Sequence, residues 1–267
     1  MNFLLLLFVL AFLVSSVGLI YFIYFFSIGY GFSIAVLSIA LLSLFSQSLS
    51  TATLTICALL CVYGFRLGLY LLIRERKSEA YKKILRSPEI AQKKPFLEVL
   101  FVWLFCALLY VLQVSPLAFR LANAADGVVV SNTAEWIGMA IMVLGFVFEI
   151  VADAQKYAAK KVKPNHFVDT GLYRLVRCPN YLGELILWSG CLLLAIGANL
   201  LWWQWLLSAL GYLGLVYVIF SGTRRLELRQ ATTYGNDPEF LSYVKHTPIL
   251  IPFIPLYSVA KYTFLKA

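Results

Sequence analysis

The densest group of polar side chains that could do chemistry lies between residues 171 and 184. Arg177 stands just before Pro179, and proline suits the first turn of a helix. Free backbone N–H groups at such a helix start, together with the arginine, favour an anion. Asn180 and Glu184 follow one helical turn apart, so an amide and a carboxylate share a helix face. Both could hydrogen-bond a carboxamide or an adenine amino group, which predicts a site for an anionic ligand that also carries such a group.

Further polar residues enter apolar stretches, where they are costly and usually face a cavity or a partner. The first such group is Tyr63, Arg66 and Tyr70, whose spacings of three and four place them on one face of a helix. The two tyrosines beside the arginine predict a lined pocket. The alternative is a structural Arg66 that extends to the membrane surface.

The second group is Glu149 and Asp153, followed on the same helix face by Lys156 and Lys160. Two carboxylates one turn apart repel each other, and the dipole near a helix carboxyl terminus prefers cations. They need partners, which are either the two lysines in a local salt-bridge network or a bound ligand. The third group lies between residues 224 and 234 and fits either ligand contact or a solvated amphipathic surface helix.

The elements that must hold these residues are membrane helices. Of the 267 residues, 61% are hydrophobic and only 13% are charged, so apolar side chains exceed what one soluble core could bury. A helix needs about 20 residues to cross a bilayer. Stretches of this kind, nearly free of charge, are expected at Asn2–Phe26, Gly31–Ser46, Ala52–Ile73, Val99–Pro116, Ala134–Ala152, Leu182–Ala198 and Leu201–Phe220. The sequence therefore predicts an all-α integral membrane bundle of about seven helices, forming a single domain over residues 1–267. Its five cysteines match neither a secreted disulfide framework nor a zinc site, so we expect no metal.

The basic residues predict the orientation of this bundle, because positive charge is retained on the cytoplasmic side. Of the 22 Lys and Arg residues, eight lie at residues 74–94, six at 156–177 and six at 224–266. In a bundle of seven helices these three segments fall on the same side of the membrane. We therefore expect the amino terminus outside and the carboxyl terminus in the cytosol. The net charge of +9 mostly reflects this bias, so we expect no nucleic-acid partner.

The order of the motifs resembles a known family of enzymes. The residues that carry the resemblance are Asp153, Gly171, Leu172, Tyr173, Arg177, Pro179, Asn180, Tyr181, Gly183, Glu184, Tyr234, Gly235, Tyr243, Thr247 and Pro248. Residues 136–255 resemble the carboxyl-terminal domain of the steroid 5α-reductase family, and most closely its poorly characterised bacterial branch. Members are seven-helix membrane enzymes that take hydride from NADPH. They reduce a carbon–carbon double bond that is conjugated to a ketone, or an isolated sterol double bond.

The resemblance implies roles for particular residues. Asn180 and Glu184 match the pair that holds the nicotinamide carboxamide, and Tyr63 matches the catalytic tyrosine that hydrogen-bonds the substrate ketone. A hydrogen bond to that oxygen would stabilise the enolate as hydride arrives. The other implied cofactor-binding residues are acidic, amide or basic groups and tyrosines: Arg66, Tyr70, Asp153, Lys160, Asn165, Tyr173, Arg177 and Arg225.

Two positions depart from the family's pattern. Steroid-reducing members pair the catalytic tyrosine with an amino-terminal glutamate, whereas this chain has no Asp or Glu before Glu75. Cys178 stands where many bacterial relatives have histidine. The first departure argues against a 3-oxo-steroid substrate, and the second affects catalysis more than cofactor binding.

Two other functions fit parts of the same pattern. Isoprenylcysteine carboxyl methyltransferases have a similar loop and tail but use S-adenosylmethionine, whose cationic sulfonium has little use for many basic residues. Glu227 before Tyr234 is the feature most compatible with them. The third possibility is a scaffold that keeps the fold without catalysis, which the missing glutamate and Cys178 support.

The reductase accounts for most of these features. We expect an NADPH-dependent enzyme of the bacterial inner membrane, with a cofactor pocket that opens to the cytosol. Its substrate is expected to be a lipid-like steroid, enone or isoprenoid that enters from the bilayer, so its partners are the membrane and a hydrophobic small molecule.

Overall fold

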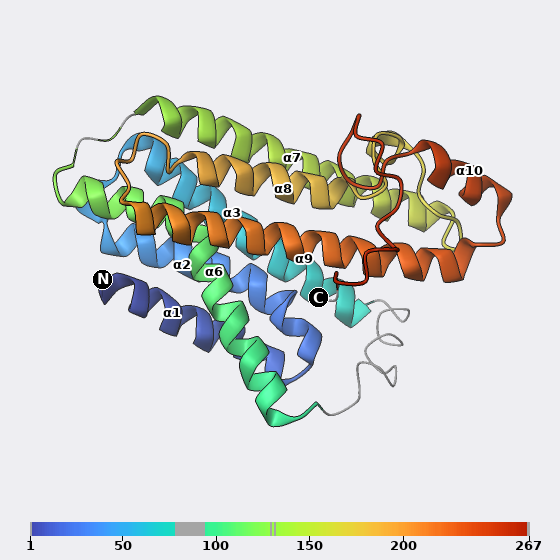
Figure 1. Ribbon diagram of the computed structural model, residues 1–267, viewed down its shortest axis with the longest axis horizontal. Helices are drawn as coiled ribbons and strands as arrows, with labels where there is room; N and C mark the ends of the chain where they lie inside the picture. The colour runs from blue at the N-terminus through green and yellow to red at the C-terminus, as the bar shows by residue number, and fades with distance from the viewer. Residues whose placement is uncertain (1, 78–93, 129, 131, 266–267) are drawn as a thin grey trace. The chain divides into compact units, whose positions relative to one another are not determined.

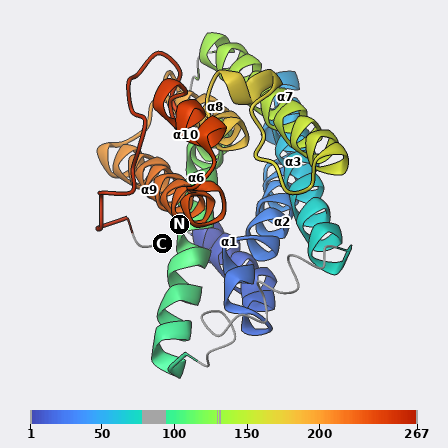
Figure 2. The same ribbon diagram turned by 90° about the vertical axis from the view of Figure 1, so that its right-hand side faces the viewer.

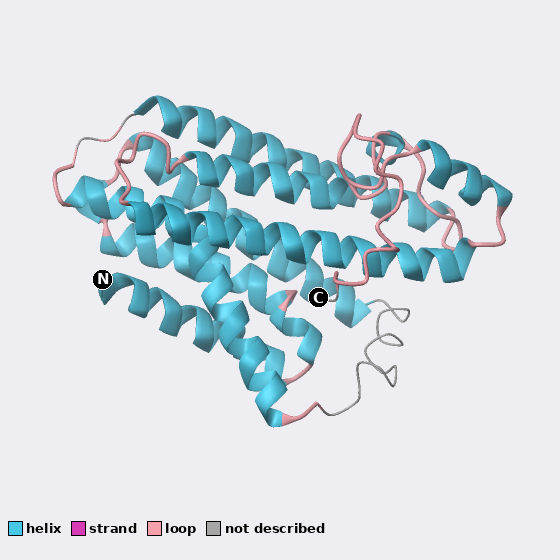
Figure 3. Ribbon diagram, in the orientation of Figure 1, coloured by secondary structure: helices cyan, strands magenta, loops and turns pink. Residues whose placement is uncertain are grey.

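The computed structural model describes residues 2–77, 94–128, 130 and 132–265. Every regular element among these residues is helical, and none of them forms a β-strand (Figures 1 and 3). Six of the helical segments are long and apolar enough to cross a membrane. The chain is therefore an all-α integral membrane protein, as its composition predicts. Most of the basic segment expected at residues 74–94 lies outside the described residues.

The chain divides into two compact units. The first unit comprises Met1–Met139 and Cys191–Tyr212, and the second comprises Ala140–Gly190 and Leu213–Ala267. Three helices have residues in both units: α7 (Asn132–Val162), α8 (Pro179–Leu193) and α9 (Trp202–Tyr234). The remaining helices of the first unit are α1 (Asn2–Ser15), α2 (Ile28–Leu44), α3 (Thr51–Lys77) and α6 (Phe96–Ala125).

The first apolar stretch, expected as one span over Asn2–Phe26, is divided. After α1 come two short 3-10 segments, η1 (Ser16–Leu19) and η2 (Phe22–Phe25). A methyl group at Gly18 would lie 2.2 Å from Cδ1 of Phe25, so only glycine lets this ring pack against the backbone. The regular helix therefore ends well before Phe26, and the next begins with α2.

The helices α2 and α3 approach each other closely at small residues. A methyl group on Gly31 would lie 2.6 Å from the backbone nitrogen of Gly68, and one on Gly64 would lie 2.5 Å from that of Ala35. A Cβ atom does not approach another heavy atom this closely in proteins, so only glycine at these positions allows the two backbones to come into contact. Small residues at such contacts are typical of membrane helices. Figures 1 and 2 show the two helices side by side, and this contact fixes the part of α3 that carries Tyr63.

A buried ion pair joins α6 to the start of α7 in the first unit. Arg120 Nε donates to Glu135 Oε1 at 2.7 Å, and both side chains are buried. The guanidinium also donates to the carbonyl oxygen of Leu194 at 3.0 Å, and the other carboxylate oxygen accepts from the Ser50 hydroxyl at 2.9 Å. Arg120 is thus satisfied by protein groups, as a buried cation requires.

The second unit is built round a close contact of α7 and α8. A methyl group on Gly145 would lie 2.3 Å from the backbone nitrogen of Leu187, and one on Gly183 would lie 2.7 Å from that of Glu149. This unit also contains η4 (Gly171–Arg174) and α10 (Pro238–His246). The glycine contact sets α8 against the part of α7 that carries the paired carboxylates.

Helix α8 is shorter than the span expected at Leu182–Ala198. It has 15 residues, fewer than the roughly 20 that cross a bilayer. Turns follow it, and among them Gly197 and Asn199 have φ values of 72° and 52°. These left-handed residues lie in the turns beyond Leu193, so the chain does not continue as a regular helix to Ala198.

Helices α7 and α9 continue well beyond their apolar stretches. The stretch expected to end at Ala152 continues as α7 to Val162, and the one expected to end at Phe220 continues as α9 to Tyr234. The added turns carry charged side chains beyond the apolar part. They supply much of the site described next.

Candidate anion-binding pocket

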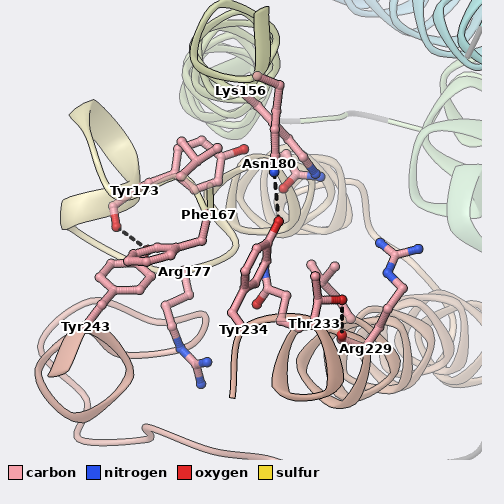
Figure 4. A pocket seen from close by; sticks show the side chains of 13 residues that line it. Lys156, Phe167, Tyr173, Arg177, Asn180, Arg229, Thr233, Tyr234 and Tyr243 are labelled. Carbon is pink, nitrogen blue, oxygen red and sulfur yellow. Dashed lines mark hydrogen bonds between the residues drawn. The ribbon is translucent and has the colours of Figure 1, made fainter. Parts of the chain in front are cut away.

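A pocket of about 140 Å³ lies within the second unit. It is formed by the ends of α7 and α9, the start of α8, the connection between α7 and α8, and α10 (Figure 4). Its lining residues are Lys156, Lys160, Phe167, Val168, Tyr173, Arg177, Asn180, Leu226, Arg229, Gln230, Thr233, Tyr234 and Tyr243.

The pocket is strongly basic. Lys156, Lys160, Arg177 and Arg229 line it, and none of its lining residues is Asp or Glu. The other polar groups that line it are amides, hydroxyls and phenols, including the Asn180 amide. Cations with hydrogen-bond donors and no competing carboxylate are what an anionic group requires. The pocket can therefore bind a phosphate or another compact anion.

Lys160 has a structural role in this pocket. Its Nζ donates to the carbonyl oxygens of Pro164 at 3.1 Å and His166 at 2.6 Å. It also donates at 2.9 Å to the hydroxyl of Tyr234, the tyrosine that Figure 4 labels. One ammonium group thus ties the end of α7 to the following loop and to the end of α9, and still contributes its positive charge.

Arg177 is buried and paired. Its Nη2 donates to Glu227 Oε1 at 3.1 Å and to the carbonyl oxygen of Tyr257. The second oxygen of Glu227 accepts from the backbone N–H of Val259 at 2.9 Å. The glutamate is therefore occupied by protein groups and does not present a free carboxylate to the pocket.

Arg229 differs from Arg177 in its surroundings. It is an exposed residue near the end of α9, and its guanidinium forms no ion pair with any residue that the structure describes. Its backbone carbonyl accepts from the Thr233 hydroxyl at 2.9 Å, as Figure 4 shows. Arg229 can therefore turn toward a bound anion without breaking another contact.

Aromatic rings form one side of the pocket. The rings of Phe167 and Tyr243 stack with centroids 5.3 Å apart, and Phe167 also packs edge-on against Tyr234 at 6.0 Å. The Tyr243 hydroxyl donates to the carbonyl oxygen of Tyr173 at 2.6 Å. Burial raises the pKa of Tyr243 above its usual range, so this phenol stays protonated and keeps donating. These rings attach α10 to the loop that precedes α8.

The loop before α8 is fixed at both of its ends. Gly171 has a φ of 60°, and the Gln155 side chain accepts from the next backbone N–H, that of Leu172, at 2.8 Å. Further along, the backbone N–H of Arg177 donates to the carbonyl oxygen of Pro248 at 2.9 Å. Helix α8 then begins at Pro179, where the proline rule places it.

Cys178 lies at the end of this loop, directly before α8. Its backbone N–H donates to the carbonyl oxygen of Ile249 at 3.0 Å. Burial raises the pKa of its thiol to about 11, although the nearby Arg177 charge acts in the opposite direction. The sulfur is therefore a buried neutral group and does not act as an acid or base near neutral pH.

Four of the cofactor-binding residues predicted from the sequence line the pocket: Lys160, Tyr173, Arg177 and Asn180. Others lie in the same unit but outside the lining. Glu184 is half-buried one turn after Asn180 on α8, and Asp153 is buried on α7. Asn165 and Arg225 are exposed.

The remaining predicted residues lie on α3 in the first unit. Tyr63 is fully buried, and its hydroxyl lies 3.2 Å from that of Tyr30 on α2, within hydrogen-bonding distance. The guanidinium carbon of Arg66 lies 5.4 Å from the ring centroid of Tyr70, a cation–π contact within one helix face. On α3, Arg66 and Tyr70 therefore contact each other, whereas the Tyr63 hydroxyl contacts Tyr30 on α2.

Several lining residues have no place among the predicted site residues. Lys156 belongs to the second polar group and Arg229 to the third, and for both groups ligand contact was one of two alternatives. Each lies one helical turn from a predicted cofactor-binding residue, Lys160 or Arg225. Phe167 has no such signal, because its position depends on how the loop and α10 pack.

Together the fold and the pocket define an all-helical integral membrane protein with a basic pocket in its second unit. Residues 10–247 match the model of a family described as a protein of unknown function (DUF1295), and the chain belongs to that family. No curated protein and no solved structure matches the chain.

Proposed function

We propose that the protein is a membrane-embedded reductase that uses NADPH to reduce a carbon–carbon double bond in a lipid-like molecule. The observation that supports this most is the pocket lined by four basic and no acidic residues. Phosphates are among the groups that such a set of donors recognises. NADPH carries phosphates, and the motif resemblance of residues 136–255 favours it among phosphate-bearing ligands.

The size of the pocket limits which part of the cofactor it holds. Clefts that enclose a drug-sized ligand measure about 300–1,000 Å³, whereas this pocket measures about 140 Å³. It therefore suits a phosphate-bearing part of NADPH and not the whole molecule. In the proposal, Lys156, Arg177 and Arg229 face phosphate oxygens. Asn180, with Glu184 one turn further along α8, binds the carboxamide.

Tyr63 is the proposed group for the substrate. NADPH supplies the hydride, and the Tyr63 hydroxyl donates a hydrogen bond to the substrate's carbonyl oxygen as negative charge develops there. Tyr30 is its partner within 3.2 Å. A bond from the Tyr30 hydroxyl to the Tyr63 oxygen would make Tyr63 a stronger donor, because linked hydrogen bonds polarise one another. The two phenols would thus take the place of the tyrosine–glutamate pair of steroid-reducing members, since this chain has no acidic residue before Glu75.

Substitution tests this role. Tyr63→Phe is expected to abolish turnover of an enone lipid while leaving nucleotide affinity nearly unchanged, because in the proposal the lost hydroxyl contacts the substrate and Tyr30 but not the nucleotide. Tyr157→Phe, a change at an exposed tyrosine of α7, is the matched control and is expected to behave as wild type. An equal loss of turnover and nucleotide binding in Tyr63→Phe would contradict the assignment.

The rival use of S-adenosylmethionine has less support in the pocket. A sulfonium is a cation, and four basic side chains would repel it. Glu227 was the feature most compatible with a methyl donor, and its carboxylate is taken by Arg177 and the Val259 N–H.

The proposed topology completes the reductase assignment. In it, α8 and the turns up to Ala198 make a seventh crossing of the bacterial inner membrane, with the amino terminus outside and the carboxyl terminus in the cytosol. The segments at residues 156–177 and 224–266, each with six basic residues, support this orientation. The pocket would then open to the cytosol, and the hydrophobic substrate would enter from the bilayer.

The decisive experiment compares three ligands on the purified full-length protein. Calorimetry with NADPH, NADH and S-adenosylmethionine, run also on Glu184→Ala, distinguishes the candidates. The reductase predicts preferential NADPH binding that weakens in Glu184→Ala. S-adenosylmethionine binding would move the protein to the methyltransferases, and binding of none of the three would favour a scaffold.

A further inference from the structure

The last described residues, 256–265, run back along α9, and we call them the C-terminal strap. The backbone N–H of Val259 donates to Glu227 Oε2 at 2.9 Å, and the Tyr217 hydroxyl donates to the Phe264 carbonyl oxygen at 3.0 Å. From the first contact to the second, the position in the strap increases by 5 residues, from Val259 to Phe264. The contacted position in α9 decreases by 10 residues. Ten helical residues rise about 15 Å. The strap therefore extends along α9 toward its apolar part, and Figure 1 shows the dark red end of the chain beside that helix.

Further contacts hold the strap against the helix. Arg224 Nε donates to the carbonyl oxygen of Ala260 at 3.1 Å, close to the bond between Val259 and Glu227. The side chains of Val259 and Leu265 are buried, whereas Phe264 is not. The strap thus has an inner side that packs on protein and an outer side that does not.

The end of the strap reaches the apolar part of α9. Helix α9 is one of the six candidate membrane spans, and its first charged residue, Arg224, follows Tyr217 by 7 residues. Seven residues correspond to about 10 Å of helix. Leu213, one turn before Tyr217, is 60% exposed and on a membrane span faces lipid. The next carbonyl oxygen of the strap, that of Leu265, lies 3.5 Å from Nη1 of Arg224. Phe264 is therefore held between the level of this charged group and that of the lipid-facing side chains.

The exposed side chains of the strap suit the boundary between lipid headgroups and acyl chains. Phe264 is 67% exposed, and Tyr257 is exposed as well. The ammonium of Lys261 lies 5.1 Å from the ring centroid of Tyr262. Aromatic rings and basic residues gather at this boundary in membrane proteins. No acidic residue follows Glu239 in the sequence, so nothing in the strap repels anionic headgroups.

The hydrogen bond from Tyr217 has a particular value at this depth. An irregular backbone carbonyl near the hydrocarbon is costly unless a protein group satisfies it. The Tyr217 hydroxyl does so for Phe264. The chain can therefore leave the aqueous side without an unpaired carbonyl at this point.

We propose that the C-terminal strap is an interfacial membrane anchor, with Phe264 in contact with the lipids that surround α9. The proposal rests on the contacts of the strap and on the apolar composition of α9, and it stands whether or not the protein binds NADPH.

Spin labels test this placement in the full-length protein. The protein is reconstituted into vesicles of phosphatidylcholine and phosphatidylglycerol, with a nitroxide attached at Phe264→Cys. Collision rates with oxygen, which concentrates in lipid, and with a water-soluble nickel complex then report depth. Leu213→Cys on α9 is the lipid reference, and Lys245→Cys on α10 is the aqueous reference, because both residues are exposed. Labelled wild type corrects for the native cysteines.

The expected result is an oxygen-to-nickel collision ratio at position 264 that lies between those of Leu213→Cys and Lys245→Cys and is several-fold above that of Lys245→Cys. A ratio equal to that of Lys245→Cys would overturn the proposal. Thr263→Cys, at the neighbouring exposed residue, provides the same reading if Phe264→Cys does not fold.

Discussion

Arg229→Gln is the sharpest test of the basic pocket. Arg229 lines the pocket from α9 and is exposed, so its loss removes a charge without disturbing a buried contact. A hydrogen bond to a charged group contributes roughly 1.5–3 kcal/mol, and exposure to solvent lowers the contribution of this one to about 1 kcal/mol. Since 1.4 kcal/mol is tenfold, we expect the Kd for NADPH to rise about fivefold.

Calorimetry measures this change against a matched control. Arg174→Gln removes the same charge from an exposed residue of the same unit that does not line the pocket, and it is expected to leave the Kd nearly unchanged. The gap between the two variants should narrow when ionic strength rises from about 0.1 M to about 1 M, because salt screens exposed charges. Equal Kd values for both variants would refute the placement of the anion beside Arg229.

Three further predictions concern stability and reactivity. Gly183→Ala should lower the free energy of unfolding by about 1–3 kcal/mol, because the added methyl meets backbone atoms of α7, whereas Gly222→Ala, with 3.4 Å to the nearest atom, should be tolerated in thermal unfolding. Glu135→Gln should cost roughly 3 kcal/mol because it leaves Arg120 buried without its carboxylate, and stability should return in the double variant Arg120→Met with Glu135→Leu; an undiminished melting temperature in the single variant would contradict this. Since burial raises the pKa of Cys178 to about 11, the thiol is protonated at pH 8, and mass spectrometry of its peptide should show no alkylation by iodoacetamide until the protein is unfolded or the pH approaches that value.

The apolar stretches predicted which parts of the chain are helical but not where the helices end. A hydropathy pattern marks the residues that lie in lipid, but it does not show whether the helix continues beyond them into water. For this reason α7 and α9 run past Ala152 and Phe220. Helix α6 likewise continues through Pro116, where the expected span ended.

The turn after α1 depends on a contact that sequence spacing does not reveal. Gly18 lies in an apolar stretch with no charged residue, so the stretch is predicted as one span. Helix α1 ends at Ser15, and in the 3-10 segment that follows the ring of Phe25 packs where a side chain at Gly18 would stand. Such a break is decided by tertiary packing, which overrides a uniform hydropathy signal.

The site was predictable where its residues belong to one local motif. The start of α8 at Pro179 and the placement of Asn180 on it follow from helix rules that act over a few residues. Tyr243 reaches the same pocket from α10, and its position depends on the stacked contact with Phe167. No periodicity links these two rings in the sequence.

The partners of Arg177 show how the chain tunes its own pocket. A pocket with four cations and no anion would be strained by mutual repulsion before any ligand arrived. Glu227, which does not line the pocket, offsets the charge of Arg177. One oxygen of its carboxylate accepts from Arg177 and the other accepts from the Val259 N–H. The carbonyl oxygen of Tyr257 adds a neutral acceptor to the same guanidinium. Residues that follow α10 thus hold the basic side chain in place, so the C-terminal segment belongs to the architecture of the pocket as well as to the surface of α9.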